Sequence, residues 1–150
     1  MNTDYRVAEV GLTYRNRVPK KDRKQILDSY TAYKILINNY SDDTIDYRET
    51  FKVLYMNQGC QVLGCSTISE GGITNTLADV RMILQGALLT NATGMVLAHN
   101  HPSGSTRPSR QDDELTRKIT EAARLLDIKV ADHIILTSED FYSYNDEGRI

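Results

Sequence analysis

The spacing of apolar and polar residues divides the chain into segments typical of strands and helices. Residues 5–15 alternate loosely and predict a strand. Ser29 is the expected N-cap of a helix that ends near Asn38 and Asn39. Residues 49–56 and 61–68 are rich in β-branched and aromatic residues, and the short turn between them predicts an antiparallel hairpin.

A second helix is expected after a turn at Gly71 and Gly72, because residues 76–79 (TLAD) form a capping-box sequence. The helix is expected to end near Asn91. Its apolar stripe would consist of Val80, Ile83, Leu84, Ala87 and Leu88.

The second half of the chain repeats this alternation. Residues 95–98 predict a buried strand whose far end leads His99 and His101 into a loop. A helix follows from Asp112, with Ser109 as its N-cap. Its apolar face would consist of Leu115, Ile119, Ala122, Ala123 and Leu126. Residues 130–136 predict another buried strand, and a final short hairpin lies within 141–148.

This order of elements predicts an α/β (α+β) fold, a mixed, partly antiparallel sheet flanked by helices. The 150 residues carry 18 Lys and Arg against 20 Asp and Glu, so we expect a single domain over 1–150 without a general attraction to nucleic acid or anionic membranes. Since the sequence has neither an export signal nor an apolar run of about 20 residues, we expect a cytoplasmic protein with no membrane partner. The oligomeric state is not indicated by the sequence.

The chain contains two cysteines, Cys60 and Cys65. Only four residues separate Cys60 from Cys65, which fits neither a disulfide framework nor a zinc ribbon, so both are expected to be reduced packing residues.

The segment from Arg15 to Lys24 contains six Lys and Arg residues. A solvated loop is its simplest interpretation, and a nucleic-acid contact is the alternative.

Two of the three histidines, His99 and His101, lie two positions apart. In an extended backbone such residues point to the same side, so both imidazoles can converge on one point. Asp112 is the expected third metal ligand, and Asp113 is its competitor. The two differ by about 100° around a helix axis, so only one of them can face the histidines. The spacing from Ser109 favours Asp112, although Ser-x-x-Asp is also an ordinary helix-capping sequence.

Two histidines and one aspartate leave a fourth tetrahedral position for water, which is typical of a catalytic zinc, here one ion per chain. Bound zinc lowers the pKa of that water to about 7. Glu49, at the start of a predicted strand, is the candidate that moves the water's proton, although by spacing alone it is one of many acids. His133 is expected to be a partly buried strand residue, with support of a metal ligand as the alternative.

These residues fall in a pattern that resembles a known family. The motif HxHP at residues 99–102, followed by SxxD at 109–112, is similar to the JAMM (JAB/MPN-type) zinc metalloprotease signature. The longer string HNHPSG…PSRQDDELT, with DHIIL further on, resembles the RadC-like branch, and the resemblance extends from about residue 29 to residue 150. RadC-like proteins often carry a helix-hairpin-helix DNA-binding region, and nothing in this sequence resembles one.

The resemblance implies that His99, His101 and Asp112 are zinc ligands, Glu49 a general acid/base, and Ser109 an oxyanion hydrogen-bond donor. It implies a fold related in outline to cytidine deaminases. The implied activity is hydrolysis of amide bonds in a peptide or protein substrate, by a metallopeptidase or isopeptidase, because eukaryotic members cleave isopeptide bonds to ubiquitin-like proteins.

Two other functions stay open at this point. A nucleic-acid-processing accessory of DNA repair is suggested by the branch's traditional name and by the Arg15 to Lys24 segment. A metal-binding interaction module without turnover is the other. HNH nucleases are excluded because they place their histidines on separate elements. Zinc deaminases are excluded because they need His-x-Glu and Pro-Cys-x-x-Cys, and neither Cys60 nor Cys65 has that context.

Overall fold

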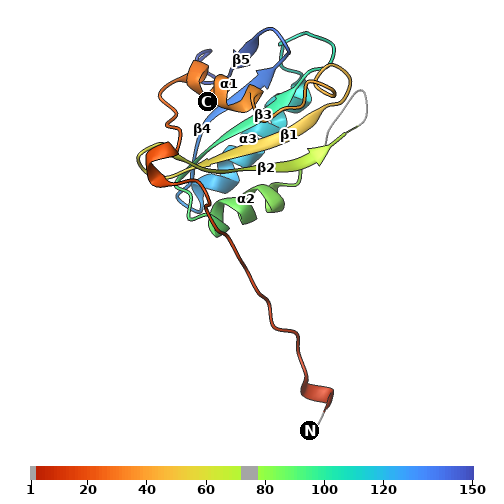
Figure 1. Ribbon diagram of the computed structural model, residues 1–150. Helices are drawn as coiled ribbons and strands as arrows, with labels where there is room; N and C mark the ends of the chain where they lie inside the picture. Colours follow the sequence, from red (N-terminus) through yellow and green to blue (C-terminus); the bar gives the residue numbers. More distant parts are fainter. Residues whose placement is uncertain (1–2, 72–77) are drawn as a thin grey trace.

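A five-stranded sheet forms the centre of the computed structural model, which describes residues 3–71 and 78–150 (Figure 1). The strands lie in the order β2-β1-β3-β4-β5. Their bounds are Thr50–Met56 (β1), Val62–Glu70 (β2), Gly94–Asn100 (β3), Lys129–Leu136 (β4) and Phe141–Ser143 (β5). β3 and β4 are parallel, whereas the other neighbouring pairs are antiparallel. The predicted mixed, partly antiparallel sheet and the hairpin of β1 and β2 are confirmed. The final hairpin differs from the prediction: β5 pairs with β4, and residues 144–148 form turns.

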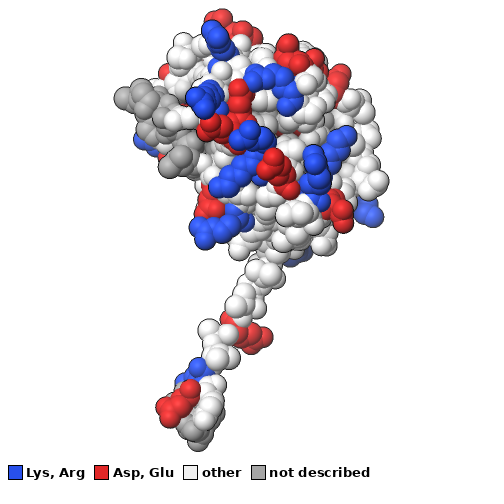
Figure 2. Space-filling model, turned by 180° about the vertical axis from the view of Figure 1, so that it is seen from behind, with Lys and Arg blue, Asp and Glu red and all other residues white. Residues whose placement is uncertain are grey.

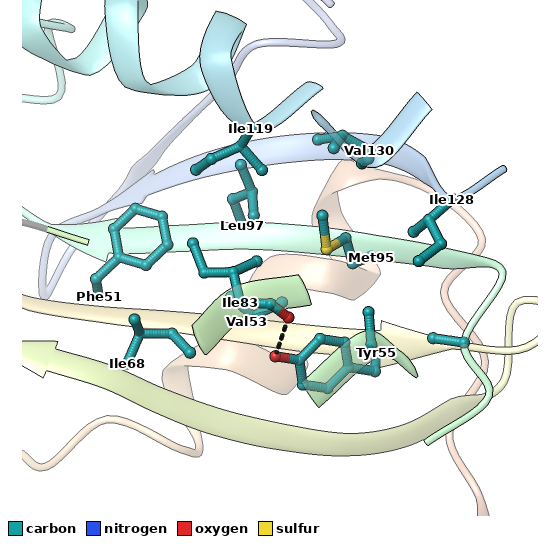
Figure 3. Close-up of a cluster of buried hydrophobic side chains, with 13 residues drawn as sticks. Phe51, Val53, Tyr55, Ile68, Ile83, Met95, Leu97, Ile119, Ile128 and Val130 are labelled. Carbon is teal, nitrogen blue, oxygen red and sulfur yellow. Dashed lines mark hydrogen bonds between the residues drawn. The ribbon is translucent and has the colours of Figure 1, made fainter. Parts of the chain in front are cut away.

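Helices cover both faces of the sheet. α1 (Ser29–Ile37) packs on one face, and α2 (Val80–Leu89) and α3 (Arg110–Arg124) pack on the other. Because side chains alternate along a strand, β1 sends Phe51, Val53 and Tyr55 toward α2 and α3 (Figure 3) and Leu54 and Met56 toward α1. The sheet therefore buries two apolar clusters. None of the described helices is long and apolar enough to span a bilayer.

The predicted strand at residues 5–15 is wrong. A 3-10 turn at Thr3–Tyr5 lies far from the body, and from it the segment runs as an extended arm to the body, where a second 3-10 turn follows at Lys20–Asp22 (Figure 1). Its apolar side chains are exposed, including Val7 at 88% and Val10 at 81%. Alternation alone does not make a strand, since a strand also requires a hydrogen-bonded neighbour.

Helix starts and amphipathic faces differ in detail from the prediction. Asp28, not Ser29, is the N-cap of α1, and Ser29 is the first helical residue. Asp79 is itself the N-cap of α2, accepting a hydrogen bond from the Arg81 N–H, while Gly72 and Thr76 of the predicted turn and capping box lie outside the described residues. The predicted apolar faces are too wide, because Leu88 and Leu126 are exposed.

The expected packing role of the cysteines is also wrong. Both are free thiols, as expected, but both are exposed. Cys60 lies in the turn before β2 with a positive φ of 61°, and Cys65 lies on β2 at the edge of the sheet. An edge strand has a neighbour on one side only, so part of its side-chain surface faces solvent.

Candidate metal centre

Four polar side chains meet at one end of β3. Glu49 immediately precedes β1, His99 lies in β3, His101 follows that strand, and Asp112 lies in the first turn of α3. The antiparallel register pairs Phe51 with His99, which brings the start of β1 alongside the end of β3. Each of the four offers one ligand atom, and these atoms all lie within 4.8 Å of one another. The fold therefore gathers three segments that are far apart in the sequence.

The two imidazoles form the centre of this cluster. The Nε2 atoms of His99 and His101 are 3.0 Å apart, so the rings converge as the two-residue spacing predicts. Asp112 places Oδ1 at 3.2 Å from Nε2 of His99 and Oδ2 at 3.3 Å from Nε2 of His101. Oε1 of Glu49 is 3.8 Å from Nε2 of His99. His99 differs from expectation in one respect: it is a buried residue of β3, not part of the following loop.

The start of α3 determines which aspartate faces the histidines. The Ser109 hydroxyl accepts a hydrogen bond from the Asp112 N–H at 3.0 Å, and the Ser109 N–H donates to the Asp112 carboxylate at 2.8 Å. This reciprocal capping box confirms Ser109 as the N-cap. Asp113 points elsewhere, accepting a hydrogen bond from the Tyr144 hydroxyl and pairing with Arg149. The 100° step around the helix thus separates the two carboxylates, with Asp112 facing the imidazoles.

The electrostatics of the cluster favour an ionised Asp112. Burial raises the pKa of the Asp112 carboxyl, but its contacts with the imidazoles of His101 and His99 outweigh burial and hold that pKa well below its ordinary value. Burial lowers the pKa of His101, but its contacts with Asp112 and the Ser105 carbonyl prevail and the pKa is raised. The Asp112 carboxylate is therefore ionised at neutral pH and attracts positive charge to the histidine nitrogens.

The donor set fits a divalent cation. Nδ1 of His101 lies 2.8 Å from the carbonyl oxygen of Ser105, which can only accept, so Nδ1 carries a hydrogen. When the ring is neutral, its Nε2 lone pair points into the cluster. A tetrahedral zinc with bonds of about 2.0–2.1 Å separates neighbouring donor atoms by roughly 3.3–3.4 Å. The separations of 3.0, 3.2 and 3.3 Å among His99, His101 and Asp112 are close to that value.

One residue beside the cluster was not identified from the sequence. Asn100, which stands between the two histidines in the sequence, is fully buried. Its side-chain amide nitrogen donates to the carbonyls of Ile45 and Arg48, each at 2.8 Å. Its carbonyl oxygen accepts from the N–H of Thr50 at 2.7 Å. These bonds fix the backbone on both sides of Glu49. A polar residue within an otherwise apolar strand was the signal available in the sequence.

His133 contacts His99, which agrees with the alternative interpretation of this residue, whereas the prediction that it is partly buried is wrong. It is completely buried on β4, and its Nε2 lies 2.8 Å from Nδ1 of His99. Its Nδ1 lies 2.6 Å from the hydroxyl of Thr116 on α3. Burial lowers the pKa of His133 far below the ordinary value, so the ring is neutral at neutral pH.

The cationic segment lies apart from this cluster. Its side chains at Arg15, Arg17, Lys20, Lys21 and Lys24 are exposed, and the guanidinium of Arg23 donates to the Val18 carbonyl at 3.2 Å. Over the face of the body shown in Figure 2, Lys and Arg side chains are interspersed with Asp and Glu. The positive charge of the segment is therefore local.

A mixed sheet between helices, with a His, His, Asp and Glu cluster at one end of the central strand, defines a JAB/MPN-type domain. The RadC-like JAB domain family matches residues 26–149, so the chain belongs to that family.

Curated relatives in several bacteria carry the name UPF0758 protein. The chain is 44% identical over 100 residues to one from Flavobacterium johnsoniae, covering 67% of this chain and 44% of the relative. It is 38% identical over 136 residues to one from Porphyromonas gingivalis, covering 88% of this chain and 59% of the relative. The UPF0758 protein YfjY of Escherichia coli is 41% identical over 101 residues, covering 67% of this chain and 63% of that protein. The chain therefore spans about half the length of the curated relatives it matches.

Proposed function

We propose that this chain is a zinc-dependent hydrolase of amide bonds, a metallopeptidase or isopeptidase. In this proposal His99, His101 and Asp112 are the zinc ligands, Glu49 is the general acid/base and Ser109 donates a hydrogen bond to the oxyanion. The supporting observation is the meeting of two imidazoles and two carboxylates within 4.8 Å, in a chain that belongs to the RadC-like JAB family.

When bound, zinc supplies Lewis-acid chemistry, polarising a carbonyl group and lowering the pKa of water to about 7. Glu49 would take a proton from the attacking water at a carboxylate oxygen and deliver it to the departing amine. Its position suits this role, because Oε1 lies 3.8 Å from Nε2 of His99, farther than the Asp112 oxygen at 3.2 Å. Glu49 can thus reach the edge of the cluster while Asp112 occupies a ligand position.

Ser109 would stabilise the negative charge that develops on the scissile carbonyl oxygen. Its hydroxyl oxygen accepts from the Asp112 N–H, and that bond does not use the hydroxyl hydrogen. A serine therefore can cap α3 and donate a hydrogen bond at the same time.

The decisive experiment combines metal analysis with peptide cleavage. The purified chain is loaded with zinc, its metal content is measured, and it is incubated with a peptide library whose newly formed amino termini are labelled and identified by mass spectrometry. We expect close to one zinc per chain and cleavage that is lost in Glu49→Gln. Zinc binding without any cleavage that depends on Glu49 would support a non-catalytic metal-binding module instead.

A nucleic-acid accessory role is the second candidate, and the exposure of Arg15, Arg17, Lys20, Lys21 and Lys24 favours it. If it is correct, the chain binds DNA at low salt, and replacement of these residues by Gln weakens binding and flattens its salt dependence. An absence of DNA binding at low salt would refute it.

A further inference from the structure

A continuous path of hydrogen bonds runs from the backbone of α3 to Nδ1 of His99, the ring nitrogen that does not face the cluster. The Thr116 hydroxyl lies 2.6 Å from the main-chain carbonyl oxygen of Asp112 and 2.6 Å from Nδ1 of His133. Nε2 of His133 lies 2.8 Å from Nδ1 of His99. The imidazoles of His99 and His133 are both buried, so protein groups take the place of water along this path.

The direction of each bond in this path follows from the donor and acceptor capacity of its groups. The Asp112 carbonyl can only accept, so the single hydroxyl hydrogen of Thr116 must point to it. The Thr116 oxygen then accepts from His133, which places the hydrogen of that neutral ring on Nδ1. Nε2 of His133 is left as an acceptor, and it receives the Nδ1 hydrogen of His99.

In the neutral ring of His99, the last bond leaves Nε2 without a hydrogen. This nitrogen is the one that faces Nε2 of His101 at 3.0 Å and Asp112 at 3.2 Å. A neutral histidine can ligate a metal only through a nitrogen that carries no hydrogen. The path therefore holds His99 in the tautomer that metal binding requires.

Aromatic contacts hold the His133 ring in the plane that this bonding needs. The ring stacks on Tyr144 with centroids 5.0 Å apart and an interplanar angle of 12°, and it meets the edge of Phe51 at 5.7 Å. Asp113 in turn anchors Tyr144 by accepting its hydroxyl hydrogen at 2.7 Å. Asp113, which does not face the metal cluster, thus holds the Tyr144 ring that stacks on His133.

We propose that Thr116 and His133 are positioning residues that fix the tautomer of His99 and so set the zinc affinity of the cluster. That the metal is zinc rests on the proposed function. Outer residues that orient metal-bound histidines typically change affinity by about 10–100-fold when removed. Thr116→Val and His133→Phe should weaken zinc binding by about that factor, since each preserves size and removes one link of the path.

Thr120 provides a matched control. It lies one turn further along α3, and its hydroxyl donates to the Thr116 carbonyl at 2.8 Å in the same way as the Thr116 hydroxyl donates to that of Asp112. Thr120→Val therefore removes an equivalent bond to the helix backbone without breaking the path. We expect it to bind zinc like the parent, and we expect Thr116→Ser, which retains the hydroxyl, to do the same.

The test measures zinc affinity by competition with a chromophoric chelator, together with ring-nitrogen NMR spectra of the metal-free proteins. With three histidines in the chain, each ring can be assigned. At a pH where the rings are neutral, the proposal expects hydrogens on Nδ1 and bare Nε2 atoms in His99 and His133 of the parent, and loss of that single tautomer in Thr116→Val.

A parent in which His99 carries its hydrogen on Nε2, or equal zinc affinity for Thr116→Val and Thr120→Val, would overturn the positioning role. A parent that binds no zinc would overturn the proposed function, and the NMR spectra would still decide the tautomer.

Discussion

Ser109 carries two separable roles, and substitution can distinguish them. Its hydroxyl caps the 15-residue helix α3 by accepting the Asp112 N–H at 3.0 Å. Replacing a capping serine by alanine costs about 1 kcal/mol, whereas glycine costs only a few tenths. For a chain of this length 1 kcal/mol corresponds to roughly 2–4 °C in Tm. Ser109→Ala should therefore lower the Tm of the metal-free protein by about that amount, and Ser109→Gly should lower it far less.

Peptide cleavage supplies the second readout, because both variants lack the hydroxyl hydrogen. Loss of one oxyanion donor costs about 10²–10³-fold in kcat, so both should lose activity to that extent while still binding zinc. Calorimetry or circular dichroism gives the Tm values, and the peptide assay gives the rates. If Ser109→Gly retains the parental rate, the oxyanion role is wrong. If Ser109→Ala is as stable as Ser109→Gly, the capping argument is wrong.

Three further predictions concern the site and the core. Asp112→Ala should abolish stoichiometric zinc binding and Asp113→Ala should retain it, as measured by metal analysis, since only Asp112 contacts the imidazoles. Zinc affinity should fall about tenfold per pH unit below the raised pKa of His101, because a proton then competes with zinc for Nε2. The Asp112 carboxyl has a lowered pKa, so it does not make zinc affinity depend on pH near neutrality. Chelator competition between pH 6 and pH 8 checks this, and an affinity that rises on acidification would contradict it. Gly86→Ala should destabilise the fold by about 1–3 kcal/mol in urea titrations despite better helix propensity, because its Cβ would lie 2.6 Å from Cζ of the buried Tyr55.

Local patterns identified most of the site. The two-residue spacing of His99 and His101 depends only on strand geometry, and the choice of Asp112 over Asp113 depends only on the angular step of a helix. The Ser109 cap likewise involves residues three positions apart. Each of these is a short-range property, and the structure agrees with each. The ligand and catalytic roles of these residues stay predictions.

Features that depend on strand pairing were beyond the sequence. The parallel register places His133 opposite Leu97 and next to His99, and no local pattern reveals that neighbour. The prediction for the extended arm that includes Val7 and Val10 was wrong for the same reason. The alternation of its residues indicated a strand, but none of the described strands of the sheet pairs with it. The exposure of Cys65 likewise depends on β2 lying at the edge of the sheet.

Anomalous X-ray diffraction at the zinc absorption edge, from crystals of the zinc-loaded chain, tests the central claim most directly. The account predicts one strong peak within about 2.0–2.2 Å of Nε2 of His99, Nε2 of His101 and a carboxylate oxygen of Asp112. Glu49 should lie beside the metal without occupying one of those three positions. A peak bound elsewhere, or none in crystals grown with zinc, would contradict the assignment of this cluster as the metal centre.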